Sequence, residues 1–306
     1  MPKLCQLKQY KKIIALAVCM CFGTMIIAPA ALAVEAETVI LEPVASGVTV
    51  LSNEKAMIDA SNAKDGYIMA AYKQPTDKKL KLRITGPDKV VYTYNLNSDG
   101  KYEVFPLSGG EGNYSIAVYE NVSGNKYATA YSTTMTVMLT DEYAPYLRAN
   151  QYVNYQADSE VVKKAAELVK DKPKSLDKIA AVYQYTVTTL TYDKEKAKTV
   201  QSGYLPDVDQ VLAEQKGICF DYAAVMASLL RSQNIPCKLV VGYTGDIYHA
   251  WINVYTAETG WIDGMIFFDG AKWQLMDPTF ASTGKKSQDI MEYISNPNNY
   301  QAKYVY

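Results

Sequence analysis

Short runs rich in Tyr, Val, Ile and Thr follow one another between about residues 64 and 140. Runs of this length and composition, separated by turn sequences, predict β-strands. The turns include Gly86-Pro87-Asp88 and Ser123-Gly124-Asn125. This spacing predicts a small antiparallel β-sandwich, preceded up to about residue 60 by a linker or an edge element. The predicted strands cover residues 67–72, 80–84, 90–94, 102–105, 114–119 and 127–139.

After about residue 159 the apolar positions change to helical spacing. The pattern predicts one helix over residues 159–169, a second that begins near Ser175 as its N-cap, and a third from Cys219 to about Arg231. Strands are then expected at residues 237–243, 250–255, 265–268 and 273–276. Because helices come first and antiparallel strands follow, the pattern predicts an α+β fold rather than a doubly wound one.

The first 33 residues have the organisation of a secretory signal. Lys8, Lys11 and Lys12 precede an apolar run over residues 13–27, and Ala31-Leu32-Ala33 has the form of a cleavage site. We therefore expect a signal peptide over residues 1–33, a β-sandwich over 34–142 and a second domain over 143–306. This organisation predicts a secreted or extracytoplasmic protein with no membrane span in the mature chain.

Composition narrows the possible partners. The chain has 306 residues, 49% of them hydrophobic and 21% charged, as in a globular protein. Without the first 33 residues, which hold four lysines and no acids, 27 basic residues face 32 acidic ones. This balance argues against a nucleic-acid binder. After residue 33 the chain has two cysteines and one histidine, too few for a typical zinc site, and it has no cofactor-binding motif, so we expect neither metal nor cofactor.

Three residues in the last third of the chain have the chemistry of a thiol enzyme. Cys219 opens a predicted helix, whose unpaired N–H groups and partial positive charge stabilise an anion. His249 can accept and return a proton near neutral pH, and the carboxylate of Asp277 can orient its ring. Each residue alone is a weak signal, because cysteines and histidines are often only packed. Their order, at spacings of 30 and 28 residues, predicts a catalytic triad.

Cys237 is expected to be buried at the start of a strand and not bonded to Cys219. A helix from Cys219 to Arg231 is about 18 Å long at 1.5 Å per residue, and Cys237 follows its far end. A disulfide needs Cα atoms within about 7 Å of each other. Cys219 is therefore predicted to be a free thiol.

Three motifs in this order resemble those of the transglutaminase-like family. The segments KGICFDYA (216–223) and IPCKLVVGY (235–243) are similar to the surroundings of its nucleophile. HAWINV (249–254) and WQLMDPTF (273–280) are similar to its histidine and aspartate motifs. The resemblance implies a papain-like core that reaches back to about Tyr143. It does not select a reaction, because the family includes protein cross-linkers, peptidases, peptide N-glycanases and inactive members. The connection over residues 259–270 is longer than the family's shortest pattern.

We therefore hypothesise an exported enzyme that cleaves or transamidates amide bonds of proteins or peptides. Its substrates could include components of the cell envelope. Tyr192 and Trp251 are candidate oxyanion or substrate-binding residues. Trp251 is also expected to pack near the histidine, and Asp221 is expected to cap the helix. The alternative is a non-catalytic binding module for the cell surface or cell wall, built on the same scaffold. The sequence leaves open the substrate, the acyl acceptor, any calcium dependence, the role of the β-rich part and the oligomeric state.

Overall fold

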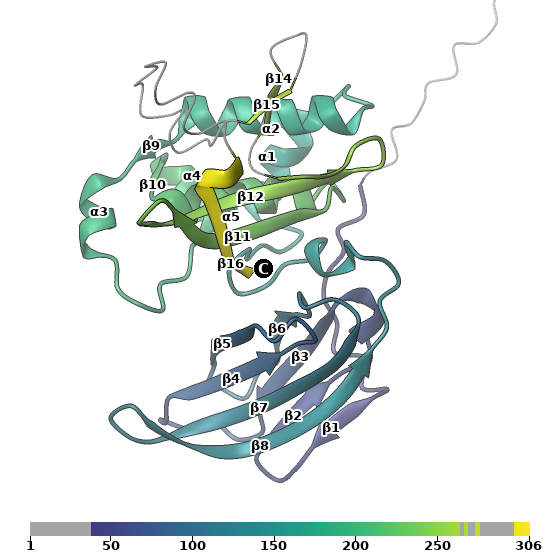
Figure 1. Cartoon of the computed structure of the whole chain (residues 1–306), viewed down its shortest axis with the longest axis vertical. Helices are drawn as coiled ribbons and strands as arrows, with labels where there is room; N and C mark the ends of the chain where they lie inside the picture. The colour runs from purple at the N-terminus through teal and green to yellow at the C-terminus, as the bar shows by residue number, and fades with distance from the viewer. Residues whose placement is uncertain (1–37, 264–265, 269–272, 276–296) are drawn as a thin grey trace, which may run out of the picture. The chain divides into compact units, whose positions relative to one another are not determined.

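Two four-stranded antiparallel sheets form the first part of the chain (Figure 1). One sheet has the order β1-β2-β3-β6 and the other the order β5-β4-β7-β8. Along β4 the buried Leu80, Leu82 and Ile84 alternate with polar residues, as in a strand that buries one face. The strands are β1 (Val50–Ser52), β2 (Ala56–Asp59), β3 (Tyr67–Tyr72), β4 (Leu80–Thr85), β5 (Val91–Leu96), β6 (Glu103–Pro106), β7 (Gly112–Ser123) and β8 (Lys126–Val137).

The structure is a computed structural model, and it describes residues 38–263, 266–268, 273–275 and 297–306. The runs predicted as strands between residues 67 and 137 are strands, and β7 is longer than its apolar run because its ends pair with β8. The stretch expected as a linker or edge element contains β1, the edge strand of its sheet, and β2 beside it. The boundaries after residues 33 and 142, and the sandwich arrangement, stay predictions.

Five helices, a third four-stranded antiparallel sheet and two short strand pairs make up the described later part. The helices are α1 (Glu160–Val169), α2 (Ser175–Thr189), α3 (Lys194–Thr199), α4 (Val208–Glu214) and α5 (Cys219–Arg231). The sheet has the order β13-β12-β11-β16, with β11 (Cys237–Thr244), β12 (Ile247–Thr256), β13 (Gly260–Ile262) and β16 (Tyr300–Val305). Two pairs lie outside it: β9 (Thr191–Tyr192) with β10 (Lys216–Gly217), and β14 (Ile266–Phe268) with β15 (Trp273–Leu275). Short 3₁₀ turns are η1 (Ala63–Asp65), η2 (Ala144–Tyr146) and η3 (Pro297–Asn299).

The predicted helices agree closely with α1, α2 and α5, and α5 has the expected bounds. Ser175 was expected as an N-cap but is the first helical residue, and Lys174 precedes it with an extended backbone. α3 and α4 were not predicted: α3 is short and lacks an apolar repeat, and α4 has Val208, Val211 and Leu212 at helical spacing but only seven residues. Asp193 and Asp207 start them by accepting hydrogen bonds from first-turn N–H groups. Within the part of the chain that the structure describes, no helix has the length and apolar character needed to span a membrane.

Helix α5 lies at the centre of the later part. It packs against α1, α2 and α4, and against strands β11 and β12. Every residue from Asp221 to Arg231 is buried, so the helix is covered on all sides. Such a helix has little freedom to shift, and its first residue, Cys219, is therefore held in one place.

Candidate functional site

Cys219 is the first residue of α5, and its free thiol is partly exposed. The chain reaches it along β10, which pairs in parallel with β9, and Ile218 then turns the backbone into the helix with an extended conformation. The first helical hydrogen bond runs from the Tyr222 N–H to the Ile218 carbonyl at 3.0 Å. The N–H groups of the preceding turn are therefore at the open end of the helix, where they favour an anion.

The side chain of Asp221 stabilises this first turn of α5. It is fully buried, and its Oδ2 accepts a hydrogen bond of 2.8 Å from the Ile218 N–H. Its predicted role as a helix cap is therefore confirmed. Gly217 is required here because a Cβ on it would lie 2.6 Å from the Cβ of Asp221. The glycine before the nucleophile thus serves the close approach of Asp221.

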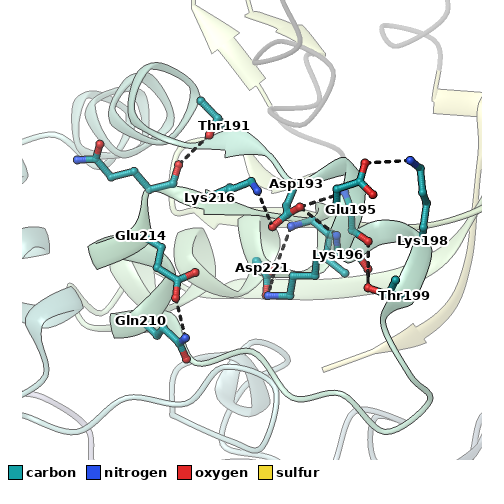
Figure 2. Close-up of polar contacts among 12 residues, drawn as sticks. Thr191, Asp193, Glu195, Lys196, Lys198, Thr199, Gln210, Glu214, Lys216 and Asp221 are labelled. Carbon is teal, nitrogen blue, oxygen red and sulfur yellow. Dashed lines mark hydrogen bonds and ion pairs between the residues drawn. The ribbon is translucent and has the colours of Figure 1, made fainter.

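Asp221 also binds two groups from the segment between β9 and α4. Lys196 on α3 lies 2.8 Å from Oδ2, and the Tyr204 hydroxyl donates to Oδ1 at 2.5 Å. Lys196 also donates to the Tyr204 oxygen at 2.6 Å. Burial and the bond to Asp221 raise the pKa of Tyr204, so it remains a neutral donor. Figure 2 shows Lys196 reaching Asp221, with a second ion pair between Lys216 and Asp193 beside it.

His249 and Trp251 lie on β12, two residues apart and on the same face. Both are 5% exposed, and their rings stack with centroids 6.2 Å apart. The predicted packing of Trp251 against the histidine is therefore observed. His249 pairs across the sheet with Gly242 of β11. Gly242 must be a glycine because a Cβ there would lie 2.0 Å from the backbone oxygen of Gln301 on β16.

Tyr248, the residue before His249, interacts electrostatically with Cys219. Burial is the largest cause of the raised pKa of Tyr248, and the charges of Tyr304, Tyr243 and Cys219 make smaller contributions. Tyr248 is nevertheless 56% exposed, and its ring contacts Tyr243 at 5.4 Å between centroids. The ring of Tyr248 is therefore accessible to a ligand.

The remaining candidates differ in what the structure describes. Tyr192 on β9 is in register with Gly217, two residues before Cys219, which is consistent with a place beside the thiol. Asp277 lies outside the described residues. The pairing of Cys219, His249 and Asp277 as a triad therefore stays a prediction, as does the oxyanion or substrate-binding role of Tyr192 and Trp251.

Lys196 and Tyr204 were not predicted as site residues, because their segment, expected as a loop over residues 196–209, has no apolar period. The only available signal was indirect: an acid in the first turn of a buried helix needs a partner. Cys237 has the predicted position at the start of β11, fully buried and free, and burial raises its pKa to about 12. The absence of a bond between Cys219 and Cys237 is therefore confirmed.

Cys219 opens a buried helix, and His249 follows on an antiparallel strand that packs against that helix. Residues 162–278 match the family described as the Transglutaminase-like superfamily, so this part of the chain is a transglutaminase-like core. The match begins within α1, extends past β15 and includes Cys219, His249 and Asp277.

The chain is also similar to individual proteins. It is 35% identical to "Uncharacterized protein YebA" of Bacillus subtilis (strain 168) over 32% of this chain, and it spans only 16% of that relative's length. A structure described as "a Putative Cysteine Protease from Cytophaga hutchinsonii" has a TM-score of 0.40 and 15% identity, covering 85% of this chain and 74% of the other. Red sea bream transglutaminase has a TM-score of 0.30 and 14% identity, covering 72% and 48%.

Proposed function

We propose that this protein is an exported, cysteine-dependent enzyme that cleaves or transamidates amide bonds of proteins or peptides, with Cys219, His249 and Asp277 as its triad. The observation that carries the proposal is the position of Cys219. Its free, partly exposed thiol begins a buried helix inside the transglutaminase-like core. A thiol with only a packing role has no need of the one helix end where an anion is stabilised.

The reaction follows from the roles of these groups. His249 takes the thiol proton, and Cys219 sulfur bonds to the substrate carbonyl carbon. The oxyanion accepts hydrogen bonds from backbone N–H groups in the first turn of α5, with Tyr192 as an additional candidate donor. His249 then gives its proton to the leaving amine as the C–N bond breaks. Water or a second amine attacks the thioester, which releases an acid or a new amide and restores the thiol. Asp277 orients His249 throughout.

The proposed substrates lie outside the cytoplasm, because residues 1–33 have the form of a cleaved signal peptide. Proteins or peptides at the cell envelope are the substrates that this location offers. The exposed Tyr248, which interacts electrostatically with Cys219, supplies an apolar surface for the part of the substrate next to the reacting carbonyl. Whether water or an amine completes the reaction is decided by which of them reaches the thioester.

The test is the rate of iodoacetamide alkylation of each cysteine against pH, followed by peptide mass spectrometry. We expect Cys219 to react at about pH 6, well below the value of about 8.5 for a model thiol, and His249→Ala to remove this reactivity. Cys237 is the internal control, since its burial and raised pKa keep it unreactive until the protein unfolds.

The same assay separates the enzyme from the binding module. If Cys219 reacts as an ordinary thiol and His249→Ala changes nothing, the enzyme proposal fails and the binding module is favoured. If the low-pH reactivity is present, incubation with peptides and a fluorescent primary amine shows whether hydrolysis or amine incorporation depends on Cys219.

A further inference from the structure

We infer that Lys196 is a positioning residue for Cys219: its ion pair with Asp221 cancels a negative charge that would otherwise oppose a thiolate at the start of α5. This inference rests on the proposed function, because it concerns the charge state of the same thiol. It assigns a role to the segment between β9 and α4, which the proposed reaction does not use.

The first step is the burial of the carboxylate. The side chain of Asp221 is 0% exposed, whereas that of Lys196 is 28% exposed. A buried carboxylate is costly unless it is paired and hydrogen bonded. Asp221 meets this requirement with one backbone N–H, one hydroxyl and one ammonium group, each 2.5–2.8 Å away. Only the ammonium group of Lys196 carries the opposite charge.

The second step is the position of the charge. Asp221 follows Cys219 by two residues, so the two groups lie within one turn, about 3 Å apart along the helix axis. Both use the positive end of the same helix. Two anions at one site disfavour each other, and a cation beside one of them removes the effect. Asp207 and Glu214 add negative charge around Tyr204, and β12, which carries Tyr248 and His249, packs against α5. Lys196 is the charged group that forms an ion pair with the Asp221 carboxylate.

The third step compares the pair of Lys196 and Asp221 with a second ion pair that joins the same two segments of the chain. Lys216 on β10 lies 3.1 Å from Asp193, the residue that caps α3. This pair joins the same two segments in the opposite sense, as Figure 2 shows. Its side chains are 48% and 17% exposed, and Asp193 is not on α5. Lys216 therefore shares the structural task of Lys196 without acting on the charge of Asp221.

The experiment measures the pH at which alkylation of Cys219 reaches half its maximal rate, in the full chain and in four variants. We expect Lys196→Met to raise this midpoint by about one pH unit, or about tenfold in rate at a fixed lower pH. Asp221→Asn should lower it, since the lysine charge is then unbalanced. The double variant Lys196→Met/Asp221→Asn should return close to the wild-type midpoint, and Lys216→Met should leave it unchanged.

The opposite shifts of the midpoint in Lys196→Met and Asp221→Asn distinguish an effect of charge from an effect of folding. If both variants only loosened the start of α5, their midpoints would shift in the same direction. Three results would overturn the inference. The midpoint could be unchanged in Lys196→Met, Lys216→Met could shift it by the same amount, or the double variant could be shifted as far as Lys196→Met. The proposed function is judged separately, by the wild-type midpoint and its dependence on His249. The difference between wild type and Lys196→Met can be measured even if Cys219 is an ordinary thiol.

Discussion

Arg231 at the end of α5 is the buried cation on which the later part of the chain depends. Its side chain is fully buried, and it donates to the backbone oxygens of Cys237 at 2.7 and 2.9 Å, Tyr306 at 2.6 Å and Arg148 at 2.7 Å. These oxygens belong to β11, the end of the β16 segment and the connection before α1. One planar guanidinium group thus joins three segments to the helix that begins with Cys219.

Arg231→Met should lower the free energy of unfolding by about 3 kcal/mol. The Tyr306 oxygen keeps a second donor, the N–H of Leu239 at 2.9 Å. The oxygens of Cys237 and Arg148 lose the guanidinium, at about 1–3 kcal/mol for each unsatisfied group. Methionine offsets part of this loss of stability, because burying an apolar side chain has no desolvation cost like that of burying a charged one.

Urea unfolding followed by tryptophan fluorescence measures this change where it occurs, since all three tryptophans (Trp251, Trp261 and Trp273) lie in the later part of the chain. Arg83→Met is the matched control, because Arg83 is exposed on β4 and its loss should cost less than about 0.5 kcal/mol. If Arg231→Met is as stable as Arg83→Met, the four hydrogen bonds do not hold these segments together and the reasoning is wrong.

Two further predictions concern other parts of the chain. The pKa of Glu120 is lowered from 4.5 to about 2, mainly by the hydrogen bond from Tyr72 and then by Lys55. Because the folded pKa is the lower one, Glu120 stabilises the fold above pH 4.5, and this contribution is lost as the pH falls towards 2. Glu120→Gln should therefore flatten the decrease of stability between these values in urea titrations, and an unchanged slope would contradict it. Gly242→Ala should lower the melting temperature by several degrees because its Cβ would lie 2.0 Å from the Gln301 backbone oxygen; a melting curve that matches the wild type would show that β16 moves away at no cost.

The sequence by itself determined the elements whose pattern is local. α5 follows from apolar residues at helical spacing between Ile218 and Leu230, and β11 and β12 from runs rich in β-branched and aromatic residues. The free state of Cys219 and Cys237 followed from helix length alone. The transglutaminase-like core was predictable because its motifs are short and contiguous.

Only the tertiary structure decided which distant groups meet. Lys196 and Asp221 are 25 residues apart, and nothing in the polar segment around Lys196 indicates that it reaches the first turn of α5. Arg231 looked like the ordinary basic end of a helix until its partners, 83 residues before it and 75 after it, were placed around it. Periodicity records which face of an element is buried, because that is a property of neighbouring positions. The partner of a buried charge is set by how the elements pack, and that information is not local.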